Sequence, residues 1–367
     1  MDVAFVSHIA SGHVRICNAD AVTNAPIHVG DSFPAEDGYC QRIIDERIPY
    51  LIPDTANVPE VAKLTCTQAM PVGSHLSVPL RLSDGSVYGT FCCFSYVPNH
   101  TLNQRDLQMM LAFAELAAAQ IEAQIRIEER ARDVTARISR IIEQDDLTMA
   151  YQPIYQLNNN QVVGVESLAR FPDSPSDWFA EAAEAGLGIE LEMTAVRSAL
   201  RGLRYLPRDI YLAVNVSPDA ILSGAVERTL RDATPGRILL EVTEHAHVND
   251  YSGLLQALKP LRGGVRIAVD DAGAGFSGLK HILEIEPDII KLDLTLTRGI
   301  DQDPAREALA TALVTFANKT GSQIVAEGIE TAAELEVLRQ LKVSFGQGYW
   351  LARPMPLSAA AQFLMAH

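Results

Sequence analysis

The stretch "VRIAVDDAG" at residues 265–273 decides how the C-terminal part of the chain is expected to fold. Its apolar, β-branched run is typical of a strand that is buried on both faces of a sheet. Two adjacent acids, Asp270 and Asp271, close the run. Neighbouring carboxylates repel each other unless a cation or a proton neutralises part of their charge. The pair therefore predicts a cation-binding position at the end of a buried strand.

Similar apolar runs recur from Leu147 onward, and a stretch of helical composition follows each of them. The runs are "VVGVESLARF" (162–171), "IYLAVNVSP" (210–218), "RILLEVTEH" (237–245), "VRIAVDDAG" (265–273), "PDIIKLDL" (287–294) and "SQIVAEGIE" (322–330). Strands that alternate with helices over about 220 residues fit an α/β fold of the TIM (β/α)8 barrel type. A doubly wound open sheet is the alternative. The missing GxGxxG motif after the first strand counts against it.

A polar residue stands at the end of each of these runs. These residues are Glu166, Asn215, Glu241, Asp270, Asp271, Lys291 and Glu327. In a parallel barrel the carboxyl ends of the strands open on one face, so these groups are expected to share one mouth. A single acid at a strand end is explained more simply as a helix cap or as the partner of an arginine. This explanation does not account for polar residues at six strand ends together. Oxygen ligands favour two Mg²⁺ or Mn²⁺ ions, which would clamp a phosphoryl group while Lys291 positions the attacking water.

Chain length, composition and net charge limit the number of domains and the classes of ligand that the protein can bind. The chain has 367 residues, of which 48% are hydrophobic, enough for two domains with full cores. A formal net charge of -16 argues against binding to long nucleic acid, which needs a basic face. A small anionic ligand held by metals remains compatible with this charge.

The start of the chain, "MDVAFVSHIASGHVRI", lacks the pattern of a secretory signal, and we find no apolar run of membrane-spanning length. Five cysteines (Cys17, Cys40, Cys66, Cys92 and Cys93) show no CxxC spacing. Reduced, small buried thiols are the simplest interpretation. We therefore expect a cytoplasmic protein with no membrane association.

The region before residue 100 alternates short apolar runs with turn residues. "LSVPLRL", "SDGS" and "VYGTFCCFSY" predict two antiparallel strands joined by a turn at Asp84 and Gly85. After Pro98 the composition changes, and residues 102–145 contain neither Gly nor Pro. This segment is predicted to be one long helix with Asn103 as its N-cap and Asp106 three residues on.

Five apolar residues of that helix follow a 4-3-4-3 spacing: Ile127, Ala131, Val134, Ile138 and Ile141. Such a seam is typical of a coiled coil and predicts a dimeric signalling linker. The alternative is a helix that packs on its own domain. The expected organisation is a sensor domain at 1–125, a helical linker at 126–146 and the barrel at 147–367.

Weaker patterns concern the residues around the mouth. Arg170, just past the first run, could grip a phosphate or pair with an acid. "GQGYWLARPMP" places Gln347 and Arg353 near aromatic residues, which suits a planar base with its phosphate, although a final strand and turn would look similar. Gly273 and Gly275 allow a tight loop after the acidic pair. His245 and His247 lack a third histidine at zinc spacing, so we do not predict a zinc site.

Several motifs occur together in one order: "YQPIYQL", "ESLAR", "NVS", "EVTE", "DDAGAGFSGL", "DIIKLD", "VAEGIET" and "QGYWLARPMP". Over residues 148–363 the chain resembles the EAL-domain family, phosphodiesterases that open cyclic di-GMP to linear pGpG. The resemblance implies a modified TIM barrel with one antiparallel strand.

The resemblance also implies roles for single residues. Glu166, Asn215, Glu241, Asp270 and Asp271 would ligate two Mg²⁺ or Mn²⁺ ions, with Lys291 and Glu327 on the attacking water. Glu327 is also counted among the metal ligands, and Glu166 among the catalytic residues. Gln347 would lie beside the second metal ion and support its position. Four residues would contact the dinucleotide: Gln152, Arg170, Gln347 and Arg353. Glu244 would hold the loop that contains Gly273 and Gly275, and this loop links dimerisation to metal binding.

The chain departs from the family pattern at three places. Ser167 replaces the middle Ala of the name-giving motif, and we expect this change to be tolerated. Ala272 replaces a usual Phe after the acidic pair, and Gly278 replaces a usual Ser. The stretch "RFPDSPSDWFAEAAEAG" (170–186) is shorter than the family's substrate-enclosing segment. These departures concern affinity and loop control rather than metal chemistry.

The first 125 residues resemble the GAF domain, a small-ligand sensor with a central antiparallel sheet. "PIHVGDSFPAEDGYCQRIIDERIPYLIPD" and "HLSVPLRLSDGSVYGTFCCFS" carry this likeness. The resemblance implies a small ligand that the sequence does not identify. Cys40, Cys92 and Cys93 could attach a chromophore or sense redox state, but buried small residues are the favoured interpretation.

Two functions follow as expectations. The first is metal-dependent hydrolysis of cyclic di-GMP to pGpG by a homodimer under GAF control. The alternative is a weak or inactive cyclic di-GMP receptor that signals to protein partners. Asp270, Asp271, Lys291 and Glu327 favour the enzyme, whereas Ala272 and the short segment favour the receptor.

Overall fold

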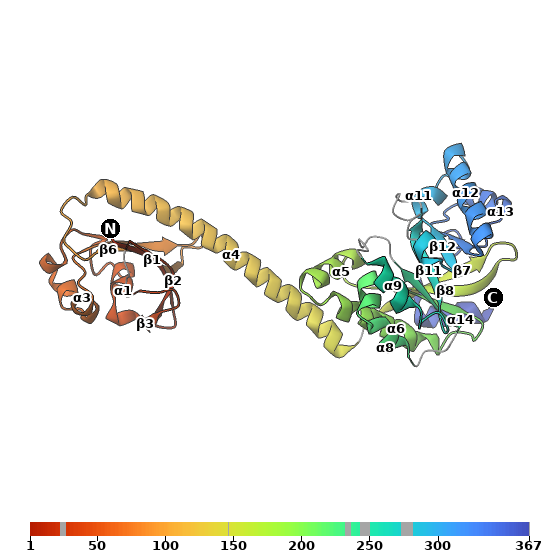
Figure 1. Cartoon of the computed structure of the whole chain (residues 1–367), viewed down its shortest axis with the longest axis horizontal. Helices are drawn as coiled ribbons and strands as arrows, with labels where there is room; N and C mark the ends of the chain where they lie inside the picture. Colours follow the sequence, from red (N-terminus) through yellow and green to blue (C-terminus); the bar gives the residue numbers. More distant parts are fainter. Residues whose placement is uncertain (23–26, 146, 232–235, 243–249, 273–281, 367) are drawn as a thin grey trace. The chain divides into compact units, whose positions relative to one another are not determined.

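Eight strands of the described chain close into a barrel in this computed structural model (Figure 1). The strands are β7 (Met149–Gln156), β8 (Gln161–Ala169), β9 (Tyr211–Val216), β10 (Ile238–Val242), β11 (Arg266–Ala272), β12 (Ile289–Leu292), β13 (Gln323–Ala326) and β14 (Phe345–Gly346). Neighbours follow chain order, and β14 pairs back with β7. Both pairings of β7 within this ring are antiparallel, whereas β8 to β14 run parallel. The expected modified TIM barrel with one antiparallel strand is confirmed.

The structure describes residues 1–366 apart from 23–26, 146, 232–235, 243–249 and 273–281, and it leaves out the side chains of residues 271 and 272. The described chain forms two units, Met1–Ala131 and Arg132–His367. Within the described helices, none is long and apolar enough to cross a membrane.

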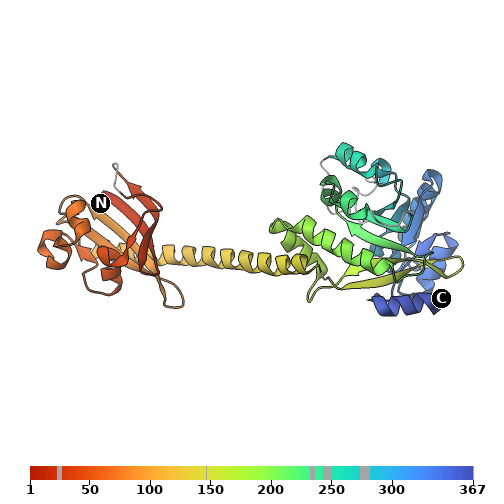
Figure 2. The same ribbon diagram turned by 90° about the horizontal axis from the view of Figure 1, so that it is seen from below.

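Helices cover the outside of the barrel strands (Figure 2). They are α5 (Pro175–Glu184), α6 (Gly188–Leu203), α7 (Pro218–Leu222), α8 (Ala225–Leu230), α9 (Tyr251–Leu258), α11 (Leu294–Thr297), α12 (Pro304–Thr320), α13 (Ala332–Gln340) and α14 (Leu357–Ala366). A short strand, β15 (Met355–Pro356), pairs with β7. Inside the barrel a second apolar cluster contains Ile154, Tyr211, Leu239, Ile289 and Phe345. The strands are therefore buried on both faces, as their continuous apolar runs predict.

The N-terminal unit is built on a six-stranded antiparallel sheet in the order β3-β2-β1-β6-β5-β4. Its strands are β1 (Val3–Ala10), β2 (His13–Ala21), β3 (Ser32–Pro34), β4 (Leu51–Ile52), β5 (Ser74–Arg81) and β6 (Val87–Ser95). Its short helices are η1 (Ala35–Asp37), α1 (Tyr39–Ile44), η2 (Thr55–Asn57), α2 (Pro59–Ala62) and α3 (Thr65–Ala69). The predicted hairpin is confirmed as β5 and β6, and Gly85 in its turn has a φ of 84°.

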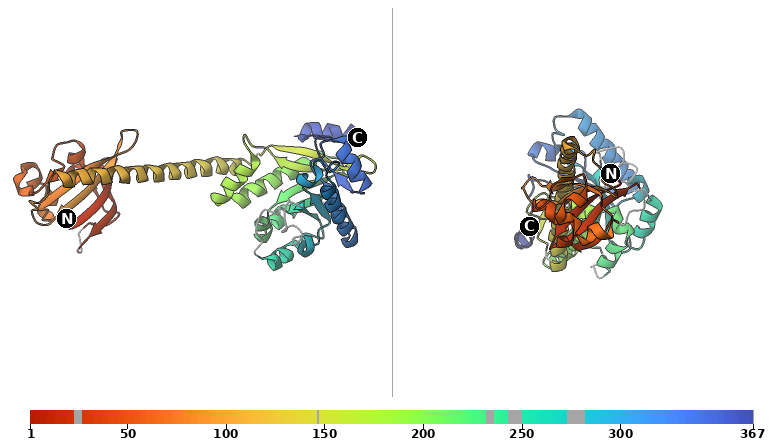
Figure 3. Two further views of the ribbon diagram at one scale, coloured as in Figure 1. Left: turned by 90° about the horizontal axis from the view of Figure 1, so that it is seen from above. Right: turned by 90° about the vertical axis from the view of Figure 1, so that its left-hand side faces the viewer.

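The predicted long helix is α4 (Gln104–Gln144). Asn103 caps it as expected, since its side chain accepts from the Arg105 amide at 2.9 Å while Asp106 accepts from the Asn103 amide at 2.9 Å. Within the N-terminal unit, α4 runs along one face of the sheet (Figure 3). Met110, Ala114 and Ala118 of α4 form a buried apolar cluster with Leu76 and Val78 of β5.

The last turns of α4 pack on the barrel unit. Ile138 is fully buried against Trp178 of α5 and Leu191 of α6, and Val134 and Ile141 pack around this contact. Ile138 is thus not a residue of a dimer seam, and the alternative of packing on its own domain holds for this part of the helix. Ile127, in contrast, is 64% exposed. The homodimer stays a prediction.

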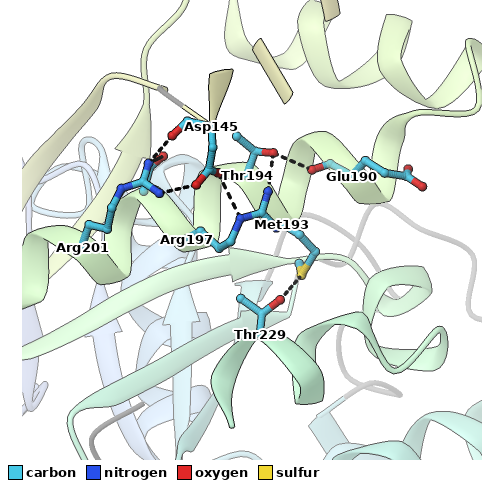
Figure 4. Close-up of polar contacts among 8 residues, drawn as sticks. Asp145, Glu190, Met193, Thr194, Arg197, Arg201 and Thr229 are labelled. Carbon is cyan, nitrogen blue, oxygen red and sulfur yellow. Dashed lines mark hydrogen bonds and ion pairs between the residues drawn. The ribbon is translucent and has the colours of Figure 1, made fainter. Parts of the chain in front are cut away.

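A pair of arginines holds the residue that follows α4 (Figure 4). Asp145 accepts from Arg197 Nε at 3.0 Å and from Arg201 Nη1 at 2.6 Å, and both arginines lie on α6. Arg201 also donates to the Asp145 carbonyl oxygen. Thr194 supports the arrangement by accepting from Arg197 Nη2 at 3.0 Å. The end of α4 is therefore tied to α6 by charge as well as by apolar packing.

Candidate active site

The side chains at the barrel mouth follow from the period of two along a strand. Each lies two residues from an apolar residue of the inner cluster, so it points to the same interior, one layer nearer the mouth. The pairs are Ile154 and Gln152, Ala213 and Asn215, Leu239 and Glu241, Ala268 and Asp270, Ile289 and Lys291, Val325 and Glu327, and Phe345 and Gln347. Glu166 on β8 has the same relation to Gly164, where a Cβ would lie 2.4 Å from the Tyr211 ring. The inner core therefore forms the floor of the site.

Lys291 lies at the centre of the acidic cluster and is only 1% exposed. Its Nζ is 2.8 Å from Glu241 Oε2, 2.8 Å from Glu327 Oε1, 3.2 Å from Asp270 Oδ1 and 3.7 Å from Glu166 Oε1. One ammonium thus contacts four carboxylates that come from four different strands or strand ends. A buried charge of this kind is stable only when it is paired and hydrogen-bonded.

Two amide side chains complete the hydrogen bonding of Glu166. Asn215 Nδ2 donates to Glu166 Oε1 at 3.0 Å, and Gln347 Nε2 donates to Glu166 Oε2 at 2.6 Å. Gln347 also donates to Glu327 Oε1 at 3.1 Å. The structure therefore brings together Glu166, Asn215, Gln347 and Glu327.

Burial and charge act in opposite directions on the titration of this cluster. Burial works against the charge of Lys291, but the surrounding carboxylates outweigh it and raise the Lys291 pKa well above its ordinary value. Burial, with the charge of Glu166, raises the pKa of Glu241 well above its ordinary value. Burial also raises the pKa of Glu327 to about 8, although Lys291 opposes it. For Glu166, burial is overcome by Lys291 and by the two amide donors, which lower its pKa.

Two buried oxygens at the mouth have no partner among the described residues, namely Glu241 Oε1 and Gln347 Oε1. Both are acceptors of the kind that hard cations bind. Within the described side chains, no three His, Cys, Asp or Glu groups are placed to hold an ion by themselves. The cluster nevertheless fits a cation, since it offers unpartnered oxygen donors beside an excess of carboxylates.

A cavity of about 800 Å³ opens beside Asn215. Its wall includes Arg170 and Ser167 from β8 and its end, and Phe179 from α5. Ser167 Oγ donates to the Ala213 carbonyl at 2.8 Å, so the polar atom that replaces the usual Ala methyl is satisfied. The segment that follows Arg170 therefore lines this cavity despite its short length.

The other predicted ligand contacts lie on the β7 side. Gln152 is directly opposite Glu166 in the β7–β8 pairing, and its Nε2 donates to the Ala352 carbonyl at 3.1 Å. Arg353 follows Ala352, and its guanidinium lies 4.4 Å from the centre of the Tyr349 ring. The predictions for Glu244, Gly273 and Gly275, and the histidines at 245 and 247, fall outside the described residues, as does the side chain of Asp271.

Sequence reasoning missed Glu192 on α6. Its carboxylate accepts from the Ser217 amide at 2.6 Å and from Ser217 Oγ at 2.7 Å. Ser217 follows Asn215 by two residues. In the sequence, Glu192 differs from a solvated helix acid only by its apolar neighbours in "LEMTAV", which is a weak pattern.

Comparison with known families decides the identity of the barrel. The EAL-domain model matches residues 135–354, more than half of the 367 residues. The chain belongs to the EAL-domain family. The GAF-domain model matches residues 3–121, so the N-terminal unit is a GAF domain placed before the EAL domain.

Several proteins similar to this EAL chain are named for cyclic di-GMP. PdeB of Escherichia coli K12, a probable cyclic di-GMP phosphodiesterase, is 28% identical over 248 residues, which cover 63% of this chain and 47% of PdeB. The PaMucR phosphodiesterase, solved as a c-di-GMP complex, is 28% identical with a TM-score of 0.56 and covers 62% of this chain and 99% of that structure.

A third relative was solved with a metal. BlrP1 of Klebsiella pneumoniae, described as a manganese and cy-diGMP complex, is 30% identical with a TM-score of 0.53 and covers 57% of this chain and 56% of BlrP1. The chain spans less than half the length of the first curated relatives that it matches.

Proposed function

We propose that this protein hydrolyses cyclic di-GMP to linear pGpG with the help of divalent cations. The observation that carries the proposal is the continuous set of contacts from Asn215 and Gln347 through Glu166 and Lys291 to Glu241. A receptor needs no ammonium among four carboxylates beneath its ligand. The names of the EAL relatives and the c-di-GMP complexes of similar structures support the substrate.

The metal ligands in this proposal are the oxygen donors at the strand ends: Glu166, Asn215, Glu241, Asp270, Asp271 and Glu327. Such donors suit two Mg²⁺ or Mn²⁺ ions, and the manganese complex of BlrP1 supports this choice. When bound, the ions supply a water of lowered pKa and offset the charge that develops on the phosphoryl oxygens. The unpartnered oxygens of Glu241 and Gln347 are available to a cation or to its water.

Lys291 and Glu327 are the residues that we assign to the attacking water. The Lys291 ammonium has hydrogen-bond donors for the water oxygen, while a Glu327 oxygen lies 2.8 Å from that ammonium and can accept a proton of the same water. Held between these two groups, the water can be kept in line with the scissile bond. The lysine also limits the repulsion between the carboxylates while substrate enters.

The dinucleotide is assigned to the 800 Å³ cavity beside Asn215 and to the adjoining β7 side. Arg170 is exposed at the cavity wall, where its guanidinium can pair with a phosphate. Gln152, Gln347 and Arg353 would contact the remaining parts of the ligand. Because Arg353 already lies over the Tyr349 ring, its side chain is partly ordered before a ligand arrives.

Regulation by the GAF domain is a further part of the proposal. Helix α4 begins in the GAF unit and ends against α5 and α6, where Arg137 lies 4.2 Å from the centre of the Trp178 ring. Helix α5 also lines the cavity through Phe179. A displacement of the end of α4, caused by an unidentified small ligand of the GAF domain or by homodimerisation, would therefore reach the cavity wall.

A timed incubation of the full-length protein with cyclic di-GMP and Mg²⁺ or Mn²⁺ tests the proposal, with EDTA as the metal-free control. We expect pGpG to form only with metal. Glu166→Ala should remove hydrolysis without unfolding the barrel, while Glu336→Ala on the exposed face of α13 should retain it. Binding of cyclic di-GMP without turnover would instead support the receptor function, for which Ala272 is the favouring observation.

A further inference from the structure

Glu192 is the strongest candidate for a role beyond the assigned site. Both oxygens of its carboxylate are used on one residue, since Oε1 accepts from the Ser217 amide at 2.6 Å and Oε2 accepts from Ser217 Oγ at 2.7 Å. Charge-assisted bonds of this length are among the stronger hydrogen bonds in proteins. A two-point contact fixes the orientation of Ser217 as well as its position.

Ser217 is the junction between a strand of the barrel and a helix. It follows β9, and its Oγ also accepts from the Ala220 amide at 3.2 Å, so it is the N-cap of α7. The hydroxyl alone would satisfy that cap. The carboxylate of Glu192 is therefore not needed to cap the helix, although burial raises its pKa and so makes its charge costly there.

Asn215 lies two residues before this junction. Its backbone is held on one side by the pairing of β9 with β10, where it is opposite Glu241, and on the other side by the Ser217 contact. Its Nδ2 donates to Glu166, which leaves Oδ1 as its acceptor for a cation. A shift of the chain at Ser217 would turn this oxygen away from the carboxylates.

Glu192 itself is placed by a rigid helix. Its neighbours on α6, Leu191 and Met193, are buried, and further along the same helix Arg197 and Arg201 hold Asp145. A side chain on a well-packed helix can set the geometry of a site more accurately than one on a loop.

We propose that Glu192 is a positioning residue for cation binding: it fixes the backbone at Ser217 and thereby directs Asn215 Oδ1 toward the cation on the Glu166 side. The inference rests on the proposed function in one respect, that Asn215 is a metal ligand. It predicts that Glu192 acts on metal affinity without touching the metal.

The test is Mn²⁺ binding to the full-length protein, measured by calorimetry. Loss of a residue that orients a ligand typically costs tenfold or more in metal affinity, so Glu192→Ala should bind Mn²⁺ about tenfold more weakly. Glu192→Gln should restore most of the affinity, because its carbonyl can accept from the Ser217 amide while its NH₂ donates to Ser217 Oγ. Ser217→Ala keeps the hydrogen bond from its backbone amide to Glu192 but loses the hydroxyl. Its affinity for Mn²⁺ should therefore fall between those of Glu192→Ala and Glu192→Gln.

Ser223→Ala is the matched control. Ser223 Oγ also accepts from a backbone amide at a helix start, that of Ala225 at 3.2 Å, but no metal ligand lies within two residues of it. The control should lose stability as Ser217→Ala does and keep the wild-type affinity for Mn²⁺. Equal Mn²⁺ affinity in wild type and Glu192→Ala would overturn the inference and leave Glu192 with a purely structural role.

Hydrogen exchange provides a readout that requires no metal. The amides of residues 215–217, 219 and 220 should exchange faster in Glu192→Ala than in wild type, and should be unchanged in Ser223→Ala. Unchanged exchange in Glu192→Ala contradicts the inference even if the wild-type protein binds no Mn²⁺, a result that by itself would count against the proposed function. Should Glu192→Ala fail to fold, Ser217→Ala and Glu192→Gln carry both measurements.

Discussion

Both units bury polar side chains against a sheet, but the two clusters differ in charge. In the barrel, one ammonium lies among four carboxylates. In the GAF domain, the buried polar groups between the sheet and α1 are hydroxyls, thiols and one imidazole. These residues are Ser7, Cys40, His75, Ser77, Thr90 and Cys92.

The neutral cluster is arranged as hydrogen-bonded pairs. Ser7 Oγ lies 2.8 Å from Thr90 Oγ1, and Ser77 Oγ lies 2.8 Å from Cys92 Sγ. The sulfur atoms of Cys40 and Cys92 are 4.0 Å apart, and both are free thiols, as expected for small buried cysteines. Because neutral groups that are hydrogen-bonded cost little to bury, these hydroxyls and thiols can close a core, whereas the buried Nδ1 of His75 has no hydrogen-bond partner among the described residues.

The charged cluster has a different energetic character. Replacing a buried ion pair with apolar residues is often neutral or stabilising, so such a cluster is weak evidence for a stabilising role. Its retention at a barrel mouth points to chemistry. The comparison therefore shows that this chain buries charge at the mouth of the barrel and neutral polar groups in the core of the GAF domain, and the proposed function gives the buried charge its role.

The largest effect is expected when the charged cluster loses its cation. Lys291→Met leaves the ionised carboxyl groups of the cluster without their counter-charge, so the free energy of unfolding of the barrel should fall by about 3–5 kcal/mol at pH 8. Mn²⁺ should restore part of it, because a ligand that binds only the folded state stabilises that state. Urea unfolding followed by tryptophan fluorescence measures this, since the two tryptophans, Trp178 and Trp350, both lie in the barrel unit.

Lys319→Met, on the exposed face of α12, is the control for this substitution. It should leave the free energy of unfolding within about 0.5 kcal/mol of the wild-type value. Equal stability of the two variants would mean that Lys291 does not hold the carboxylates together, and the contrast between the clusters would fail.

A smaller effect is expected from pH in the neutral cluster. His75 is 2% exposed, its ring centre lies 4.3 Å from that of Tyr39 with the two rings tilted by 33°, and burial lowers its pKa to about 3. Between that value and the ordinary pKa of about 6.5, the unfolded chain binds a proton that the folded chain does not. Stability of the GAF unit should therefore fall with decreasing pH by about 1.4 kcal/mol per unit between pH 6 and 4 from this residue alone.

His75→Phe should reduce that slope, whereas His100→Phe at an exposed position should not. Calorimetry measures the effect in the unfolding transition that tryptophan fluorescence does not report. An equal slope in wild type and His75→Phe would show that His75 is protonated in the folded GAF domain.

The smallest effect is expected from a single hydrogen bond in the neutral cluster. Ser77→Ala removes the hydroxyl 2.8 Å from Cys92 Sγ and should lower the free energy of unfolding by about 1 kcal/mol. The same calorimetric transition measures it, with Ser32→Ala on the exposed edge strand as the control. A loss above about 3 kcal/mol would be too large for a hydrogen bond between neutral groups, and would mean that the contrast in charge between the two clusters does not hold.

Much of the site could be predicted from the sequence because its residues obey a local rule. An apolar run ends at each of five site residues: Asn215, Glu241, Asp270, Lys291 and Glu327. Side chains alternate along a strand, so residues two positions apart point to the same face. The hairpin of β5 and β6 and the Asn103 cap of α4 were predictable for the same reason, since turn and cap residues act on neighbours in the chain.

The contacts that give the site its chemistry were not predictable in this way. The sequence does not place Lys291 Nζ 2.8 Å from Glu241, which is 50 residues away, or Glu192 on Ser217, which is 25 residues away. The seam on α4 shows the same limit, because its spacing cannot tell a dimer partner from the Trp178 side chain that covers Ile138.

The sequence by itself therefore determined the alternation of strands and helices, the polar residue at each strand end and the long helix, because these depend on periods of two and 3.6 residues. Only the tertiary structure decided which carboxylates share Lys291, which residue holds Ser217 and which face of α4 is covered. Those choices depend on distances between segments that are far apart in the chain, and these distances are set by closure of the barrel and by packing of the helices around it.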